Sequence, residues 1–142
     1  MKAVLLSIRA KYCERIANGK KTVDVRKTRP KIKPPFKCYI YCTKRFDKGH
    51  GTDGYFQGKY CGKVIGEFIC DTMIIDRTLG YNDLFNAMAC LDVGDIAAYC
   101  LNDPMYGWHI SDLVIYDEPK ELSEFGLKRP PQSWNYVVEC EK

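Results

Sequence analysis

Apolar residues along this chain recur mainly at the two-residue spacing of β-strands. In residues 37–43 the alternation is complete, because Cys38, Ile40 and Cys42 fall on one face and the residues between them on the other. Residues 62–75 form the longest run and contain Gly66, where a bend is expected. The pattern predicts strands at residues 3–7, 20–26, 37–43, 62–75, 94–101, 108–116 and 134–140.

Two segments have helical spacing instead. Residues 8–18 carry one apolar stripe, for which Ser7 is the expected N-terminal cap. A second helix is predicted over residues 81–91. Between the elements lie a basic, proline-rich loop at residues 27–37 and an exposed loop at residues 44–59 that is rich in glycine and charge.

The length and the order of elements limit the fold. A chain of 142 residues is large enough for one core, so residues 1–142 are predicted to form a single domain. Five to seven short strands with two helices suit a small closed β-barrel flanked by helices. The same pattern also suits an open α+β sheet, and the pattern alone does not separate the two.

Charged residues gather where the first predicted helix ends and the next strand begins. Gly19 is a helix-ending signal, Lys21 follows it at the junction, and Asp24 and Arg26 lie on the strand. Strict alternation would put Lys21 on the face opposite Asp24 and Arg26. The three can share one site only if Lys21 precedes the regular strand or a bulge shifts the register.

The spacing of these residues resembles the G-x-K-x-x-E-x-R signature of ASCH domains, which belong to the PUA-like superfamily. The matching positions are Gly19, Lys21, Asp24 and Arg26, with Asp24 where most of the family has Glu. Segments in matching order that resemble small ASCH proteins, often encoded by phages and prophages, are residues 5–8, 62–68, 108–113 and 129–134. The resemblance implies an α+β fold, a small mixed-sheet PUA-like β-barrel flanked by two or more short helices.

The resemblance also implies binding of RNA, or of a modified nucleotide, in a basic cleft. A small hydrolase stays open as the alternative, either an amidohydrolase acting on acylated cytidines or a ribonuclease, with Lys21 and Asp24 as catalytic residues. The amidohydrolases have a hydroxyl residue two positions before the signature arginine, where this chain has Asp24, so Asp24 would have to act as a base. The residues expected at the site are Lys21, Asp24, Arg26, Tyr41, Lys44, Trp108 and Ser111.

Two kinds of side chain at this site have competing interpretations. Arg26 is expected to be exposed and to bind the ligand, so that Arg26→Ala would abolish binding with little loss of stability. A surface arginine that pairs with Asp24 or Asp71 is the alternative. Trp108 and Tyr41 are candidates for stacking on a base, and packing in the core or beneath a loop is the alternative.

Charge is divided unevenly along the chain. Residues 1–63 carry 17 Lys/Arg and 4 Asp/Glu, a net +13, whereas residues 64–142 carry 5 and 14, a net −9, which together give +4. If the basic residues share a surface, they favour a phosphate-bearing partner, with the loop at residues 27–37 making the backbone contacts. Alternatively, the two halves neutralise each other across the fold.

Eight cysteines are many for this length, yet no two are spaced as Cys-x-x-Cys. Cys38 and Cys42, four residues apart on a strand, would lie roughly 13 Å apart, too far to chelate one metal. No apolar run reaches the roughly 20 residues that span a bilayer, and the first residues do not read as a secretory signal. We therefore expect a cytoplasmic protein with reduced thiols, no disulfide, no metal and no cofactor.

Overall fold

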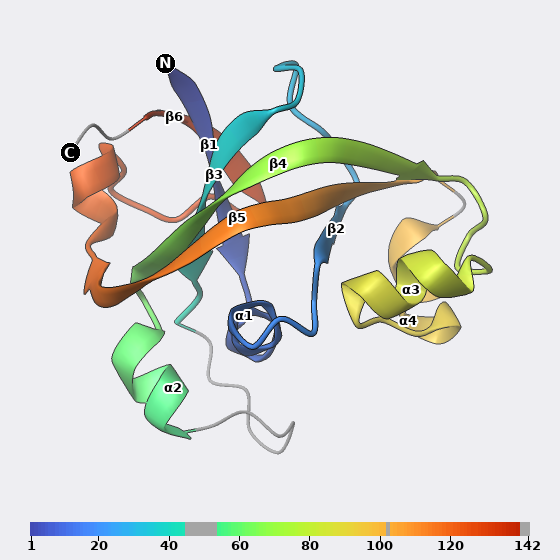
Figure 1. The fold of residues 1–142 in the computed structure, drawn as a ribbon, viewed down its shortest axis with the longest axis horizontal. Helices are drawn as coiled ribbons and strands as arrows, with labels where there is room; N and C mark the ends of the chain where they lie inside the picture. The colour runs from blue at the N-terminus through green and yellow to red at the C-terminus, as the bar shows by residue number, and fades with distance from the viewer. Residues whose placement is uncertain (45–53, 102, 140–142) are drawn as a thin grey trace.

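The computed structural model describes residues 1–44, 54–101 and 103–139, and its main feature is one curled, mixed sheet (Figure 1). The spatial order of the strands is β2-β5-β4-β3-β1-β6, in which β1 and β3 are parallel and the other neighbours antiparallel. The strands are β1 (Lys2–Ile8), β2 (Val23–Arg26), β3 (Phe36–Cys42), β4 (Val64–Asp76), β5 (Met105–Lys120) and β6 (Trp134–Val138).

Short helices flank the sheet, as the sequence predicts. Helix α1 lies against the curl of the sheet, and α3 and α4 lie together beyond β2 (Figure 1). Within the described residues, no helix has the length and apolar character needed to cross a membrane. The helices are α1 (Ala10–Ala17), α2 (Gly54–Tyr60), α3 (Asp83–Ala89), α4 (Val93–Cys100) and the 3-10 turn η1 (Leu122–Phe125).

The sheet is not closed into a barrel. β2 and β6 are its two outer strands, and β2 pairs along its four residues with β5. The α+β class and the flanking helices are therefore confirmed, whereas the closed barrel is corrected to an open, curled sheet. The edge strand β2 is short, and its last residue, Arg26, pairs with Tyr106 one residue after the start of β5.

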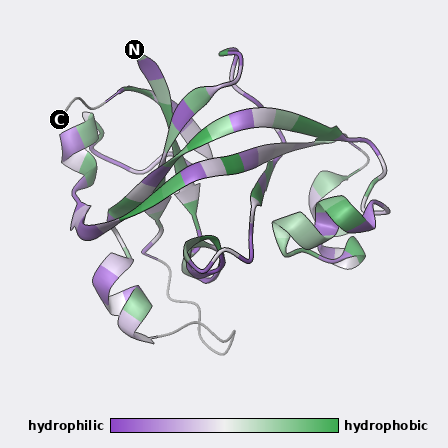
Figure 2. Ribbon diagram, viewed as in Figure 1, coloured by the Kyte–Doolittle hydropathy of each residue, from purple (hydrophilic) through white to green (hydrophobic). Residues whose placement is uncertain are grey.

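The alternation along β3 separates two apolar clusters, because β3 is buried on both faces. Cys38, Ile40 and Cys42 face α1 and the main core, whereas Tyr39 and Tyr41 pack on the other side with residues such as Phe125. Apolar residues accordingly follow the inner strands, and polar residues are frequent on the loops and outer faces (Figure 2). Burial of both faces explains why Tyr41 is not on a solvent-facing surface.

Three local predictions are wrong. Residues 94–100 belong to helix α4, whose start is capped reciprocally by Asp92 and Asp95, and Leu101 caps its end. The loop predicted at 44–59 contains helix α2, and residues 45–53 of it lie outside the described residues. Ser7 does not cap α1, because its hydroxyl donates to the carbonyl oxygen of Pro131 at 2.6 Å.

Gly66 is the position in β4 at which a bend is expected. The register with β5 shifts around this residue, and a Cβ there would press on the backbone oxygen of Val114 and lie 3.2 Å from the Cα of Ile115. Glycine is thus required at Gly66 by the close approach of β5.

We predict that Gly66→Ala lowers the free energy of unfolding by about 1–3 kcal/mol, the usual cost of forcing extra atoms into a packed site. Gly58→Ala is the matched control, because it lies in α2 with open space at its Cβ position. That control should be neutral or stabilise by about 0.5–1 kcal/mol. Urea unfolding of both variants measures the difference, and equal effects would contradict the packing argument.

Candidate functional site

The structure has a cleft of about 530 Å³ between the end of β1, the start of α1, strand β2 and helix α4. Polar groups and aromatic rings both line it, as is usual for small-molecule sites. The residues that line it are Ser7, Ile8, Arg9, Tyr12, Lys21, Asp24, Val25, Arg26, Leu91, Gly94, Asp95, Ala98 and Tyr99.

Lys21 joins the cleft because it precedes the regular strand. The chain reverses at Gly19, which has a φ of 83°, and the Lys21 N–H then donates to Arg15 O at 3.0 Å. β2 begins only at Val23, so the alternation of the strand does not yet apply to Lys21. The first of the two conditions for a shared site is therefore met.

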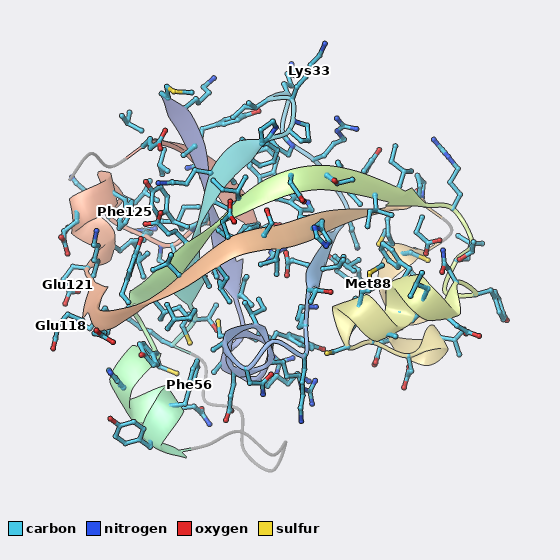
Figure 3. All side chains as sticks on the ribbon, in the orientation of Figure 1. Lys33, Phe56, Met88, Glu118, Glu121 and Phe125 are labelled. Carbon is cyan, nitrogen blue, oxygen red and sulfur yellow. The ribbon has the colours of Figure 1, made fainter. Side chains whose placement is uncertain are left out.

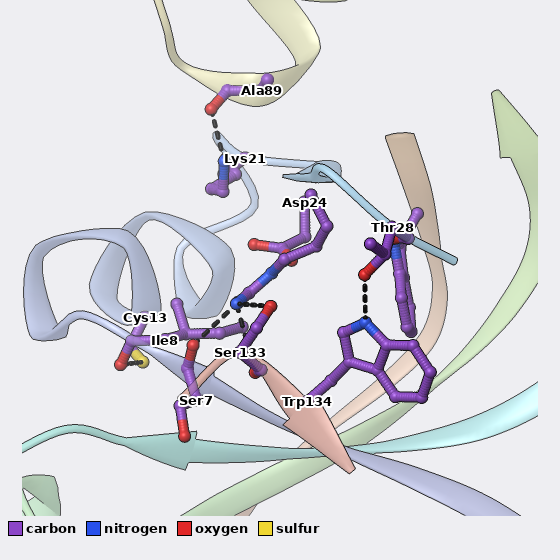
Figure 4. Close-up of polar contacts among 11 residues, drawn as sticks. Ser7, Ile8, Cys13, Lys21, Asp24, Thr28, Ala89, Ser133 and Trp134 are labelled. Carbon is purple, nitrogen blue, oxygen red and sulfur yellow. Dashed lines mark hydrogen bonds and ion pairs between the residues drawn. The ribbon is translucent and has the colours of Figure 1, made fainter. Parts of the chain in front are cut away.

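The Lys21 ammonium group is buried and has one backbone partner. The side chain is 3% exposed, and Nζ donates to Ala89 O, at the end of α3, at 2.5 Å (Figure 4). Nζ also lies 4.9 Å from the centre of the Tyr12 ring. Desolvation lowers the pKa of Lys21 from its ordinary value of 10.5, and the nearby Asp24 carboxylate opposes part of that shift.

Asp24 and Arg26 are two residues apart on β2 and therefore share one face of the strand. Arg26 Nε donates to Asp24 Oδ2 at 2.6 Å, and both side chains are buried. This charge-assisted pair fixes the Asp24 carboxylate in the wall of the cleft.

Arg26 also bridges the two open edges of the sheet. Its Nη2 donates to Ser7 O at 2.8 Å, and its Nη1 lies 3.2 Å from both the backbone oxygen and the hydroxyl of Ser133, just before β6 (Figure 4). Next along this seam, Trp134 Nε1 donates to Thr28 Oγ1 at 2.9 Å. Arg26 is only 9% exposed, so the prediction of an exposed arginine with little structural role is wrong.

The other four expected site residues lie away from this cleft. Trp108 is 0% exposed and packs edge-on against Phe36, so it offers no stacking surface. Tyr41 is 1% exposed in the cluster on the far side of β3. Lys44 lies over Gly62, and the Ser111 hydroxyl donates to the β4 backbone at Ile69 O. The cleft thus brings together Lys21, Asp24 and Arg26 but none of these four residues. A ligand-binding role for the three residues in the cleft stays a prediction.

The aromatic walls of the cleft were not among the expected site residues. Tyr12 comes from α1, where the apolar stripe predicted packing only. Tyr99 comes from α4, and Lys27 Nζ lies 4.8 Å from the centre of its ring. If residues 93–100 had been predicted as a helix, Tyr99 would have been placed one turn from Asp95 and could have been identified as a residue of the cleft.

A second hollow, of about 450 Å³, lies beside the basic loop. Its lining combines three exposed cations, Lys2, Arg29 and Lys31, with the half-buried rings of Trp134 and Tyr136. The two rings pack edge to face, and the Lys31 N–H donates to the Tyr136 hydroxyl at 2.9 Å. Lys33, at the outer end of the same loop, points to solvent (Figure 3).

The two oppositely charged halves neutralise each other only in part. Lys37 pairs with Glu67 at 2.9 Å and lies 3.4 Å from Glu139, and Lys63 pairs with Glu121. The hydrogen bond to Glu67 is the main cause that raises the pKa of Lys37. The other cations of the basic loop are exposed, namely Lys27, Arg29, Lys31 and Lys33. In the described part of the chain, no three His, Cys, Asp or Glu side chains are grouped as a metal would require.

Comparison with known proteins gives the fold. An ASCH protein from Zymomonas mobilis matches this structure with a TM-score of 0.71 at 19% identity, over 96% of this chain and 88% of that one. Its tyrosine-to-phenylalanine variant matches with a TM-score of 0.72 at 18% identity, over 98% and 92%. Neither a protein-family model nor a curated protein sequence matches. The chain therefore has the fold of these ASCH proteins, which confirms the resemblance at the level of the fold.

We predict that Arg26→Ala lowers the free energy of unfolding by about 3–5 kcal/mol, because it leaves the buried Asp24 carboxylate without its cation. In an Asp24→Asn background the same change should cost clearly less. Arg29→Ala, at an exposed arginine nearby, is the control and should stay within about 0.5 kcal/mol. Denaturant unfolding of the wild type and the four variants measures these effects, and a small effect of Arg26→Ala would contradict its structural role.

The lowered pKa of Lys21 predicts a pH dependence of stability. Below the lowered pKa, folded and unfolded chains both carry the ammonium, and the burial penalty is complete. Between that pKa and 10.5, the unfolded chain holds the proton that the folded chain has released, so stability rises with pH. Relative to Lys21→Met, the wild type should therefore gain stability as pH rises through this window.

Urea unfolding across a pH series checks this prediction. Lys20→Met is the control, because Lys20 is exposed and the change removes the same charge. A pH-independent difference between the wild type and Lys21→Met would show that Lys21 titrates as an ordinary lysine.

Proposed function

We propose that this protein belongs to the ASCH proteins by descent as well as by fold, and that it binds single-stranded RNA, taking one nucleotide into the cleft that contains Lys21 and Asp24. The observation that carries the proposal is the convergence of a cation, a carboxylate and two tyrosine rings on one hollow of about 530 Å³. Hollows of about 300–1,000 Å³ accept small ligands of nucleotide size.

The chemistry of the lining suits the parts of a nucleotide. Asp24 accepts hydrogen bonds, so it can receive an amino group on the edge of a base, as on cytosine or adenine. Tyr12 and Tyr99 supply apolar faces against which a splayed base can stack. Lys21 supplies a donor for a phosphate or a carbonyl oxygen. Arg26 has its donors engaged by Asp24, Ser7 and Ser133, so we assign it to positioning Asp24.

The basic loop provides the contacts to the rest of the strand. Lys27 touches the Tyr99 ring at the cleft wall, and Arg29, Lys31 and Lys33 continue along the surface. Contacts to phosphates need charge and little geometry, which an exposed loop supplies. The aromatic hollow of Trp134 and Tyr136 adjoins this loop and can stack a second base.

We predict that a short labelled single-stranded RNA binds at low salt and that its affinity falls as salt rises. Four phosphate contacts on the loop would weaken binding about 50-fold between about 50 and 200 mM salt. The double variant Lys31→Gln/Lys33→Gln should flatten the salt dependence, whereas Lys21→Met and Asp24→Asn should weaken binding of nucleoside monophosphates as well. Fluorescence anisotropy and calorimetry measure the two effects.

Lys20→Met is the matched control, since it removes one charge beside the cleft without entering the lining. Phosphate contacts contribute strongly to affinity at about 50 mM salt. If the wild type does not bind RNA under this condition, the proposal is wrong. If Lys21→Met and Asp24→Asn leave RNA binding unchanged, the protein binds RNA but the cleft is not the binding site.

A small hydrolase is the second candidate, and the lowered pKa of Lys21 favours it. A desolvated lysine beside a carboxylate can act as a base, or activate water together with Asp24. If the wild type hydrolyses an acylated cytidine or cleaves RNA, and Lys21→Met and Asp24→Asn remove that activity, hydrolysis becomes the better-supported function. Unchanged substrates after long incubation would leave the binding function as proposed.

A further inference from the structure

Two cysteine side chains lie within reach of each other beside the end of β3. Cys42 is the last residue of β3, Cys61 follows α2, and their Sγ atoms are 3.9 Å apart. The backbone holds this arrangement, because the Gly62 N–H donates to Cys42 O at 2.8 Å and the Cys42 N–H donates to Lys63 O at 2.9 Å. The turn at Gly62, with a φ of 80°, sets Cys61 over the strand.

The two thiols differ in their access to solvent. Cys61 is half-buried, whereas Cys42 is 0% exposed. A small oxidant in solution therefore meets Cys61 first, and Cys42 lies directly behind it. A disulfide bond is about 2.05 Å long, so the sulfurs must approach by about 1.9 Å, which is within reach of a side-chain rotation at Cys61.

Three fully buried cysteines of the described chain are less suited to this chemistry. Cys38 and Cys70 also lie near each other, but both are fully buried, and burial raises the pKa of Cys70 to about 12. Cys13 approaches Cys42 from α1, but it is fully buried, and burial raises its pKa as well. A thiol that stays protonated and shielded reacts slowly with oxidants.

We propose that Cys42 and Cys61 are a modification site, a thiol pair that a hydroperoxide converts to a reversible disulfide. The Cys61 sulfur attacks the peroxide oxygen, breaks the O–O bond, and yields a sulfenic acid with release of one alcohol or water. The Cys42 sulfur then attacks Cys61, forms the S–S bond and releases water. The two thiols supply the two electrons and two hydrogens that the peroxide takes up.

This chemistry is separate from the proposed RNA site and does not depend on it. In the structure both residues are thiols, and reducing conditions keep them so. Under oxidising conditions the bond would tie the end of β3 to the turn after α2. Neither cysteine lines the cleft.

The test begins with fully reduced protein that is freed of reductant, treated with hydrogen peroxide, unfolded and alkylated. We expect six of the eight cysteines to be alkylated after oxidation, and all eight once dithiothreitol is added. Tryptic peptides should show residues 60–63 joined to residues 38–44, since cleavage follows Lys37, Lys44, Lys59 and Lys63. Because residues 38–44 also contain Cys38, the crosslink must persist in a Cys38→Ala variant.

Variants decide the assignment. Cys61→Ser, at the half-buried position, should abolish the crosslink without disturbing the core. Cys90→Ser, at another half-buried thiol, should leave it intact. Three outcomes would each overturn the proposal. They are a main product that joins any other pair of cysteines, loss of two thiols that continues in Cys61→Ser, and over-oxidation of Cys61 with no crosslink.

Discussion

The ion pair between Asp24 and Arg26 is the interaction on which both the fold and the cleft depend. The sheet has two outer strands, β2 and β6, and no backbone ladder of the described chain joins them. The Arg26 guanidinium spans this gap, with Asp24 on its own strand and the backbone oxygens of Ser7 and Ser133 on the other side. A planar group with five donors can make all these bonds at once, which a lysine cannot.

A buried arginine is costly to desolvate, and here the partners of Arg26 offset that cost and also connect parts of the fold. The carboxylate neutralises the charge, and the carbonyl oxygens belong to residues at the ends of β1 and β6. The same bonds set Asp24 in the cleft wall opposite α4. Lys21 is then the cation of this triad whose position depends on a single backbone acceptor, Ala89 O. The cleft thus combines an arginine held by several hydrogen bonds with a lysine held by one.

The sequence predicts this arrangement unevenly, for physical reasons. Alternation located β1, β3, β4 and β6, because their apolar periods reflect burial directly. It failed at α4, where a short amphipathic helix capped by Asp92 has too few turns to be told from a strand. The spacing of Lys21, Asp24 and Arg26 identified residues that share one cleft. It did not reveal that Arg26 bridges two strands over 100 residues apart in sequence, nor that Trp108 is enclosed by Phe36 and Trp134, since both depend on tertiary contacts.

The most direct test of the account is native-state hydrogen exchange on the wild type and on an Arg26→Leu variant, which keeps the bulk and removes the charge. If Arg26 joins the open edges, the amides of β2 and β6 should lose protection together, while those of β3 and β4 in the centre of the sheet stay protected. Unchanged protection of β6 in the variant would contradict the account, because it would show that the two edges hold their places without the Arg26 bridge.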